Sequence, residues 1–309
     1  MNVYTTDKIR NVVLLGHGGC GKTSLTEAMA FLSGITNRMG KVSDGNTISD
    51  YDKEEIKRQF SISTSLIPLE YEGENGPIKI NLLDTPGYFD FVGEVEEAVS
   101  VADAAVIVVN CKAGIEVGTE KAWELCEKYN LPRLFFVTNM DDDHASYREL
   151  VLKLETRFGR KIAPFQLPIR ENEKFVGFVN VVKMKGRRFT ELSNYVECEI
   201  PDYVEKNLGI AREALMEAVA ETSEEYMERY FSGEEFTQEE ISNALRSHVI
   251  EGNIVPIMLG SGINCQGFSV LLQAFDKYFP SPDRYECIGV DVSTGERFTA
   301  KYDDNVSLS

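Results

Sequence analysis

Short apolar runs recur along the chain, and stretches of helical periodicity separate them. The runs lie at residues 12–15, 78–83, 104–109, 134–137 and 254–259. Near-continuous apolar runs of this length are typical of strands that are buried on both faces of a parallel sheet. Their alternation with helices predicts an α/β layered domain.

A sixth strand is predicted beside the second run. Residues 66–71 alternate apolar and polar positions, and the turn Gly73-Glu74-Asn75-Gly76-Pro77 returns the chain toward residues 78–83. This pattern predicts an antiparallel hairpin. The expected core is a mostly parallel six-stranded sheet flanked by helices.

The pattern changes after a helix predicted at 147–158. Residues 160–200 hold β-like stretches such as 175–182, with turns predicted at Glu171-Asn172 and at Gly186, and residues 203–250 predict acidic helices. Thr237 followed by Glu240 indicates a capping box. We therefore expect one domain made of residues 1–158 and 251–284, interrupted by an inserted α+β subdomain at 159–250.

The length of 309 residues predicts about two domains. Residues 285–309 begin a β-rich pattern that does not complete a domain. Either this tail is disordered or the chain is a fragment of a longer protein, and we favour the fragment.

Composition narrows the class of protein. The hydrophobic fraction of 43% allows a packed core, no apolar run approaches the roughly 20 residues of a membrane span, and the N-terminus lacks a signal-peptide pattern. A cytoplasmic protein is therefore expected. Six cysteines without CxxC pairing and three histidines without ligand spacing favour reduced structural thiols over a zinc site. The net charge of −18 argues against a chain that clamps nucleic acid, although one face could still dock on a ribonucleoprotein.

The strongest motif follows the first apolar run. Residues 16–23, GHGGCGKT, satisfy GxxxxGK[ST] and open a predicted helix. Glycines let consecutive backbone N–H groups form an anion nest, and the helix N-terminus adds partial positive charge. Lys22 would meet the β- and γ-phosphates, and Thr23 would offer a hydroxyl to Mg²⁺. The alternative is a Gly-rich loop that only turns a corner, but the strand–loop–helix context favours phosphate binding.

A second loop, Asp84-Thr85-Pro86-Gly87, follows the run at 78–83. It could be only a surface turn. At the end of a buried strand in this type of fold, however, a carboxylate holds Mg²⁺, here through water. Gly87 can offer its N–H to a γ-phosphate because it has no side chain. The position favours a phosphate-sensing loop.

Asp141 is the candidate for base recognition. It follows the buried run at 134–137, and an ionised carboxylate only accepts hydrogen bonds, so it could accept from both N1–H and the exocyclic amine of guanine. Adenine would leave one group unpaired. A backbone N–H in Leu259-Gly260-Ser261-Gly262 could meet guanine O6. A plain loop carboxylate is the alternative, and the place in the sheet order favours guanine. The expected ligands are GTP or GDP with Mg²⁺.

With these motifs in place, residues 9–284 resemble the GTPase domain of translational GTPases of the elongation factor G type. The segments PFQLPI, FVGFVNVV, EFTQEEISNALR and VPIMLGSG look like its insert and closing strand, and PSP at 280–282 resembles the end of its first domain. The last residues look like the start of a β-barrel second domain. Full-length members carry further domains that grip the ribosome.

The resemblance assigns the site residue by residue. Residues 57–63 resemble the first switch, in which Ser61 takes the place of a Mg²⁺-holding threonine, and residues 84–88 match the second switch. The implied metal ligands are Thr23, Ser61 and Asp84. The implied nucleotide-binding residues are Gly16, His17, Gly18, Gly19, Cys20, Gly21, Lys22, Thr23, Ser24, Asp84, Thr85, Pro86, Gly87, Tyr88, Thr138, Asn139, Met140, Asp141, Ser261, Gly262 and Ile263.

Three departures from the family pattern affect binding. Asn139 replaces a lysine whose stem packs over the base, a loss on the order of 1 kcal/mol or less. Thr138 replaces an asparagine, which is a modest change. Gly19 replaces an aspartate associated with a monovalent cation, so no such ion is expected.

The fourth departure affects catalysis, for which the resemblance implies Tyr88, Lys22 and Gly87. Tyr88 takes the place of a histidine that orients the attacking water. Unlike an imidazole, a phenol cannot add positive charge. Loss of such a group costs about 10²–10⁴ in rate. We therefore expect a GTPase that binds GTP well and hydrolyses it slowly.

Three functions remain open. The first is a ribosome-stimulated GTPase that supports translocation, and the second is a ribosome ligand in which nucleotide occupancy is the signal. A ribosomal-protection factor is the third and ranks lower, because such proteins resemble the histidine form. The four departures favour a paralogue over the main factor, and a monomer is expected. The resemblance implies that the insert faces the ribosomal stalk protein and that the switches face large-subunit RNA. Neither a membrane nor DNA is an expected partner.

Overall fold

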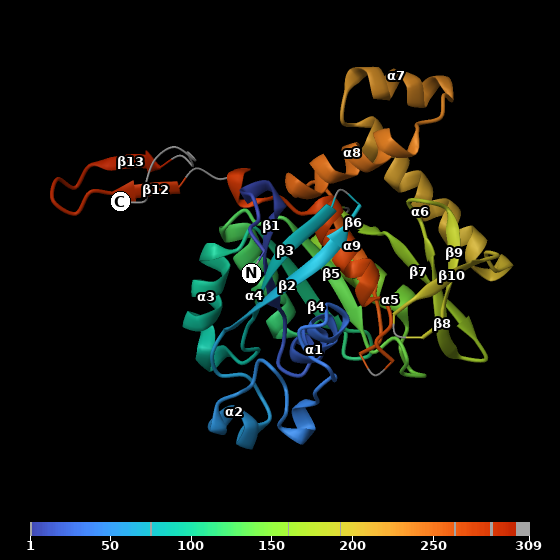
Figure 1. Ribbon diagram of the computed structural model, residues 1–309. Helices are drawn as coiled ribbons and strands as arrows, with labels where there is room; N and C mark the ends of the chain where they lie inside the picture. The colour runs from blue at the N-terminus through green and yellow to red at the C-terminus, as the bar shows by residue number, and fades with distance from the viewer. Residues whose placement is uncertain are drawn as a thin grey trace.

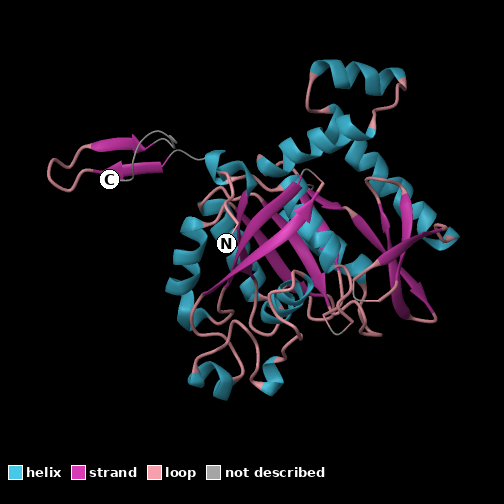
Figure 2. Cartoon of the chain, in the orientation of Figure 1, coloured by secondary structure: helices cyan, strands magenta, loops and turns pink. Residues whose placement is uncertain are grey.

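The computed structural model describes residues 2–74, 76–159, 161–191, 193–262, 264–284 and 287–300. Its centre is a seven-stranded sheet (Figures 1 and 2). Only the β2–β3 pair is antiparallel among its described strands. In spatial order the strands are β2 (Ser65–Gly73), β3 (Gly76–Asp84), β1 (Ile9–Leu15), β4 (Ala104–Asn110), β5 (Arg133–Thr138), β11 (Val255–Leu259) and β6 (Ile162–Pro164).

The predicted parallel sheet and its hairpin are confirmed, with one strand more than expected. All five apolar runs lie in strands of this sheet, and residues 65–73 pair antiparallel with 76–84. The seventh strand, β6, pairs with β11 through Ile162. It was missed because it has three residues, too few for a period, and one is Pro164. Thus the stretch expected to form only the insert contributes a strand to the main sheet.

Helices cover both faces of the sheet (Figure 1). Helices α1 (Lys22–Leu32) and α9 (Phe268–Tyr278) contact each other on one face. Helices α3 (Val92–Val101) and α4 (Val117–Lys128) contact each other on the other. The predicted helix at 147–158 is confirmed as α5 (Tyr147–Phe158). It contacts α4 through the stacked rings of Phe158 and Trp123, whose centroids are 4.5 Å apart. The strands β4 and β5 between these layers are almost wholly buried.

The insert is a four-stranded antiparallel sheet followed by three helices. In chain order these are β7 (Gln166–Glu171), β8 (Lys174–Asn180), β9 (Lys185–Phe189), β10 (Tyr195–Cys198), α6 (Asp202–Ala220), α7 (Glu224–Ser232) and α8 (Gln238–Ile250). The hairpin turn after Glu171 is confirmed, but the turn predicted at Gly186 is wrong. Gly186 lies within β9, where a Cβ would stand 2.6 Å from the Cys198 carbonyl oxygen. The glycine permits close strand approach rather than a turn.

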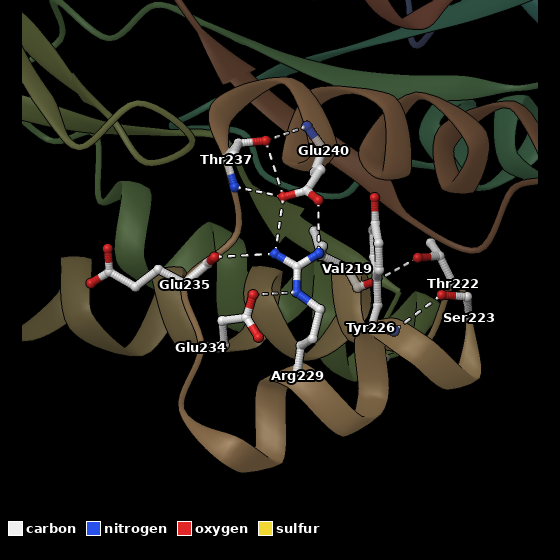
Figure 3. Close-up of polar contacts among 9 residues, drawn as sticks. All are labelled: Val219, Thr222, Ser223, Tyr226, Arg229, Glu234, Glu235, Thr237 and Glu240. Atoms are coloured by element: carbon white, nitrogen blue, oxygen red, sulfur yellow. Dashed lines mark hydrogen bonds and ion pairs between the residues drawn. The ribbon is translucent and has the colours of Figure 1, made fainter.

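A charged cluster joins α7 to α8, and Figure 3 shows it in detail. Arg229 on α7 forms ion pairs with Glu240 on α8 (2.7 Å) and with Glu234 (3.1 Å). The predicted capping box is confirmed, since Thr237 N–H donates to the Glu240 carboxylate at 2.8 Å and the Thr237 hydroxyl accepts from Glu240 N–H at 3.3 Å. The Arg229 hydrogen bond, and then the Thr237 backbone, lower the pKa of Glu240 to about 2.

Short elements complete the described part of the chain. They are η1 (Thr6–Lys8), η2 (Val42–Asp44), α2 (Lys53–Arg58), η3 (Phe89–Phe91), η4 (Pro282–Arg284), β12 (Cys287–Val290) and β13 (Arg297–Ala300). Strands β12 and β13 pair antiparallel, and residues 301–309 lie outside the described residues. The start of a second, barrel-type domain stays a prediction. Among the described helices, none combines the length and apolarity needed to cross a membrane.

Candidate nucleotide site

Four loops at the carboxyl edge of the sheet carry the predicted site residues. They follow β1, β3, β5 and β11, and the loop after β1 is the phosphate loop. The loop after β3 closely approaches the phosphate loop, and the loop after β5 forms hydrogen bonds with both the phosphate loop and the loop after β11. Ligands of open α/β sheets bind outside this edge. The sheet topology thus brings together residues that are up to 246 positions apart, from Gly16 to Gly262.

The phosphate loop has the backbone of an anion nest. Gly16, Gly19 and Gly21 have φ values of +142°, +79° and +104°. A Cβ on Gly16 would stand 2.4 Å from the Val108 carbonyl oxygen, so this position requires glycine. Buried Lys22 donates from Nζ to the carbonyl oxygens of Gly16 and His17, both at 2.9 Å. The loop therefore holds its own lysine above the helix terminus, where phosphate would bind.

Hydroxyl and carboxylate oxygens cluster beside the first turn of α1. The Thr23 and Ser61 hydroxyl oxygens are 3.2 Å apart, and Ser61 donates to Asp50 Oδ1 at 2.7 Å. Asp84 is 1% exposed, and both its carboxylate oxygens lack a hydrogen-bond partner among the described residues. Burial raises the pKa of Asp84 to about 6. The nearby Ser49 hydroxyl and the Lys22 ammonium oppose this rise, although neither completes a hydrogen bond to the carboxylate.

These oxygens fit a magnesium ion. Buried carboxylate oxygens in folded proteins are normally paired, and a hard cation satisfies them as well as hydrogen bonds do. The structure brings together the three predicted ligands, Thr23, Ser61 and Asp84, and adds Asp50, which sequence reasoning missed. Its Oδ2 also lacks a partner among the described residues. The polar run Ser49-Asp50-Tyr51-Asp52 contained no periodic signal that would single out this carboxylate.

Two buried glutamates hold the segment that carries Ser61. Glu27 on α1 accepts from the backbone N–H groups of Gly40 (2.7 Å) and Ile48. Glu55 on α2 accepts from those of Ile62 (2.9 Å) and Ser63. Neither glutamate was predicted as a functional residue. For Glu27, the sequence signal was an acidic residue at a core-facing position of the predicted helix α1.

The loop after β3 rests on the phosphate loop. A Cβ on Gly87 would lie 2.6 Å from Lys22 Nζ and 2.7 Å from Gly18 Cα. Tyr88 is 44% exposed, and its ring centroid is 4.7 Å from that of Phe60. A Cβ on Gly18 would lie 3.0 Å from Tyr88 Cζ. The tyrosine ring therefore covers the phosphate loop and contacts the segment that carries Ser61. Thr85 fixes the start of the loop by donating to the Leu14 carbonyl at 2.6 Å.

The loops after β5 and β11 form the opposite end of the site. Thr138 donates from its hydroxyl to the Cys20 carbonyl at 2.8 Å, and Met140 N–H donates to the Gly260 carbonyl at 3.4 Å. Asp141 is half-buried and follows directly. Ser261 is 0% exposed, and a Cβ on Gly262 would contact Ser24. Asn139 is exposed with φ +57°, and Ile263 lies outside the described residues.

Comparisons with known proteins agree with this geometry. The profile of the family described as "Elongation factor Tu GTP binding domain" matches residues 7–281. Elongation factor G of Thermotoga petrophila is 36% identical over 302 residues, which is 97% of this chain and 43% of that protein. The Thermotoga maritima protein of the same name is 35% identical over the same shares. The chain thus spans less than half the length of these relatives.

A solved structure shows the same fold. A protein of Thermus thermophilus superposes with a TM-score of 0.83 at 37% sequence identity, over 90% of this chain and 41% of that one. Fold, site and sequence therefore agree: the chain belongs to the translational GTPase family of the elongation factor Tu GTP-binding domain, with elongation factor G among its relatives.

Proposed function

We propose that this chain is the nucleotide switch of an elongation-factor-G-like protein that binds GTP or GDP with Mg²⁺ and acts on the ribosome. The observation that carries the proposal is buried Asp84, whose unpartnered oxygens lie at the phosphate loop together with Thr23, Ser61 and Lys22. A buried carboxylate without partners is unfavourable unless a ligand uses it. Here the ligand is a metal-bound phosphate tail.

The residues divide the work of binding. Backbone N–H groups of residues 16–23 and the Lys22 ammonium bind and orient the phosphates, and Gly87 offers an N–H to the outermost one. Thr23, Ser61, Asp84 and Asp50 hold Mg²⁺, which when bound neutralises phosphate charge. Asp141 accepts from the guanine edge, and the backbone at residues 261–263 meets O6. The two segments 41–64 and 84–100 thereby sense the γ-phosphate.

Turnover is proposed to be slow because of Tyr88. Phosphoryl transfer depends mainly on positioning and charge stabilisation, and a neutral phenol can orient water but adds no positive charge. Tyr88 also contacts Phe60 and so links the two segments that would sense the γ-phosphate. A tyrosine that links these segments without promoting turnover favours a second candidate function, a ribosome-binding module in which nucleotide occupancy is the signal. A ribosomal-protection factor ranks third.

The proposed partner is the ribosome, approached by the monomeric full-length factor in the cytoplasm. The relatives are named elongation factor G, and this naming supports the assignment. In the proposal the switch segments face large-subunit RNA and the insert faces the stalk protein. The net charge of −18 gives no independent support for RNA contact.

Two measurements test the proposal. Titration of the full-length protein with GTP, GDP and ATP should show tight binding of both guanine nucleotides and weak binding of ATP, and Asp141→Ala should abolish that preference. Equal affinity for ATP and GTP would remove the guanine assignment. Phosphate release with and without ribosomes then separates the functions, because brisk ribosome-dependent turnover would exclude the occupancy module.

A further inference from the structure

The side chain of Arg170 in the insert reaches the loop that carries Asp141. Arg170 lies near the end of β7, and its Nη2 donates to the Met140 carbonyl at 2.7 Å. The same nitrogen is 3.5 Å from the Asp142 carbonyl oxygen and 3.4 Å from that of Ala145. One guanidinium group therefore donates hydrogen bonds to backbone carbonyls on both sides of Asp141.

The local backbone aims Arg170 at this loop. The register between β7 and β8 shifts between Ile169 and Arg170, and such a bulge redirects the side chain that follows it. Arg170 Nη1 donates to the Glu173 carbonyl in the hairpin turn at 2.8 Å. The Tyr203 hydroxyl on α6 accepts from Arg170 N–H at 2.8 Å and donates to the Arg170 carbonyl at 2.9 Å. Side chain and main chain of Arg170 are thus both held within the insert.

The loop itself has few other tethers among the described residues. Met140 N–H reaches the Gly260 carbonyl, at a long 3.4 Å. Lys112 pairs with the Asp142 carboxylate at 3.1 Å, but the lysine side chain is 56% exposed, and exposed pairs stabilise little. The charge-assisted hydrogen bond from Arg170 to Met140 is shorter than both contacts and is partly buried, so water screens it less than the exposed lysine pair.

We propose that Arg170 is a positioning residue for guanine recognition. It keeps residues 140–145 in the conformation that aims the Asp141 carboxylate at the base edge, and it couples the inserted subdomain to nucleotide retention. The inference rests on the proposed function, because it requires a guanine nucleotide at this site. Arg170 is only partly buried, so its replacement leaves no cavity in the core.

The choice of nucleotide separates positioning from mere structural support. Inosine diphosphate (IDP) lacks the exocyclic amine of guanine. It can therefore donate to the Asp141 carboxylate from N1–H only, whereas GDP can donate from both groups. If Arg170 aims that carboxylate, its loss weakens GDP binding more than IDP binding. If Arg170 only supports the fold, both affinities fall together.

The experiment compares Arg170→Ala and Arg170→Lys with Arg188→Ala in the full-length protein. Arg188 lies on β9 of the same insert sheet and pairs with exposed Glu171, so it is a matched control. Affinities for GDP and IDP with Mg²⁺, GDP dissociation rates and thermal unfolding would be measured for each variant. We expect Arg170→Ala to lower GDP affinity about five- to tenfold, with faster dissociation and a reduced GDP-to-IDP ratio. Arg170→Lys should be intermediate, and Arg188→Ala should equal the wild type.

Each outcome decides between the claims. Unchanged GDP affinity in Arg170→Ala would overturn the inference and leave the proposed function intact. Equal losses for GDP and IDP would make Arg170 a structural residue and overturn its positioning role. Should Arg170→Ala fail to fold, the GDP-to-IDP ratio of Arg170→Lys decides. A wild-type protein that binds no guanine nucleotide would instead refute the proposed function.

Discussion

The aromatic ring of Tyr88 contacts that of Phe60, with centroids 4.7 Å apart and an interplanar angle of 57°. The first ring belongs to the loop after β3 and the second to the segment that carries Ser61. A tilted aromatic pair at this distance contributes about 0.5–1.5 kcal/mol beyond its buried area. The two segments that would sense a γ-phosphate are therefore in direct apolar contact, and a change in one is felt by the other.

Tyr88→His should raise ribosome-dependent GTP hydrolysis. An imidazole can orient water and add positive charge, so we expect an increase of about 10²–10⁴-fold with little change in GTP affinity. Single-turnover phosphate release measures it. Tyr88→Phe is the matched control because it keeps the ring against Phe60 and removes only the hydroxyl. A histidine variant no faster than the wild type would show that Tyr88 is not what limits the rate.

Gly87→Ala should reduce GTP affinity more than GDP affinity. The added Cβ would collide with Lys22 Nζ and Gly18 Cα, so the loop must move away from the outermost phosphate. Overpacking of this kind costs about 1–3 kcal/mol, which we expect to appear as a roughly tenfold or larger fall in the ratio of GTP to GDP affinity. Gly93→Ala in α3 is the control, since a Cβ there meets nothing within 4 Å. Equal affinity ratios in both variants would contradict the assignment of Gly87.

Asp84→Asn should stabilise the nucleotide-free protein and weaken magnesium-dependent binding. The change removes a buried charge that lacks hydrogen-bond partners among the described residues. We expect a gain of about 1–3 kcal/mol in the free energy of unfolding at pH 7. Denaturant unfolding and GTP titrations with and without EDTA measure the two effects. A variant that is destabilised and still binds GTP in a magnesium-dependent way would contradict the prediction.

Acid should loosen the junction of α7 and α8. Ion pairing with Arg229 holds the pKa of Glu240 below its unfolded value, from 4.5 to about 2. A depressed carboxyl pKa contributes stability that is present above pH 4.5 and is lost as pH falls through about 2. Hydrogen exchange in α7 should therefore accelerate over this window, and Glu240→Gln should show the fast exchange already at pH 7. Glu239→Gln removes the charge of an exposed neighbour and should exchange as slowly as the wild type. Equally fast exchange in both variants would show that the cluster in Figure 3 does not stabilise this junction.

Local patterns predicted the sheet because its central strands are buried on both faces. The β4 strand is apolar except for Asn110, and β5 is apolar between Arg133 and Thr138, so both strands could be recognised from their runs of apolar residues. Strand β6 escaped because its three residues depend on the neighbouring β11 rather than on a pattern of their own. Gly186 was misread for a related reason. The sequence alone does not distinguish a glycine that allows close approach of a neighbouring strand from a glycine that forms a turn.

The site was predictable where a motif has a fixed spacing, as in residues 16–23. It was not predictable where tertiary contacts alone select the residue. Asp50 and Arg170 lie in polar stretches, and only the fold brings them to Ser61 and Met140. Fixed-spacing motifs, the sheet order and the family resemblance located residues on separate elements, such as Lys22, Asp84 and Asp141. No pattern marked the side chains that only the tertiary fold brings to the site, such as Asp50 and Arg170.

The hydrogen bond from the Thr138 hydroxyl to the Cys20 carbonyl joins the two ends of the site directly. The separation between the phosphate cradle and the base edge is therefore fixed by the protein before any ligand arrives. A ligand that engages both ends must match this length, because stretching either loop would break a buried bond. The site therefore selects ligands by length. Preorganisation of this kind favours nucleotides whose phosphate-to-base distance matches the site over shorter or longer analogues.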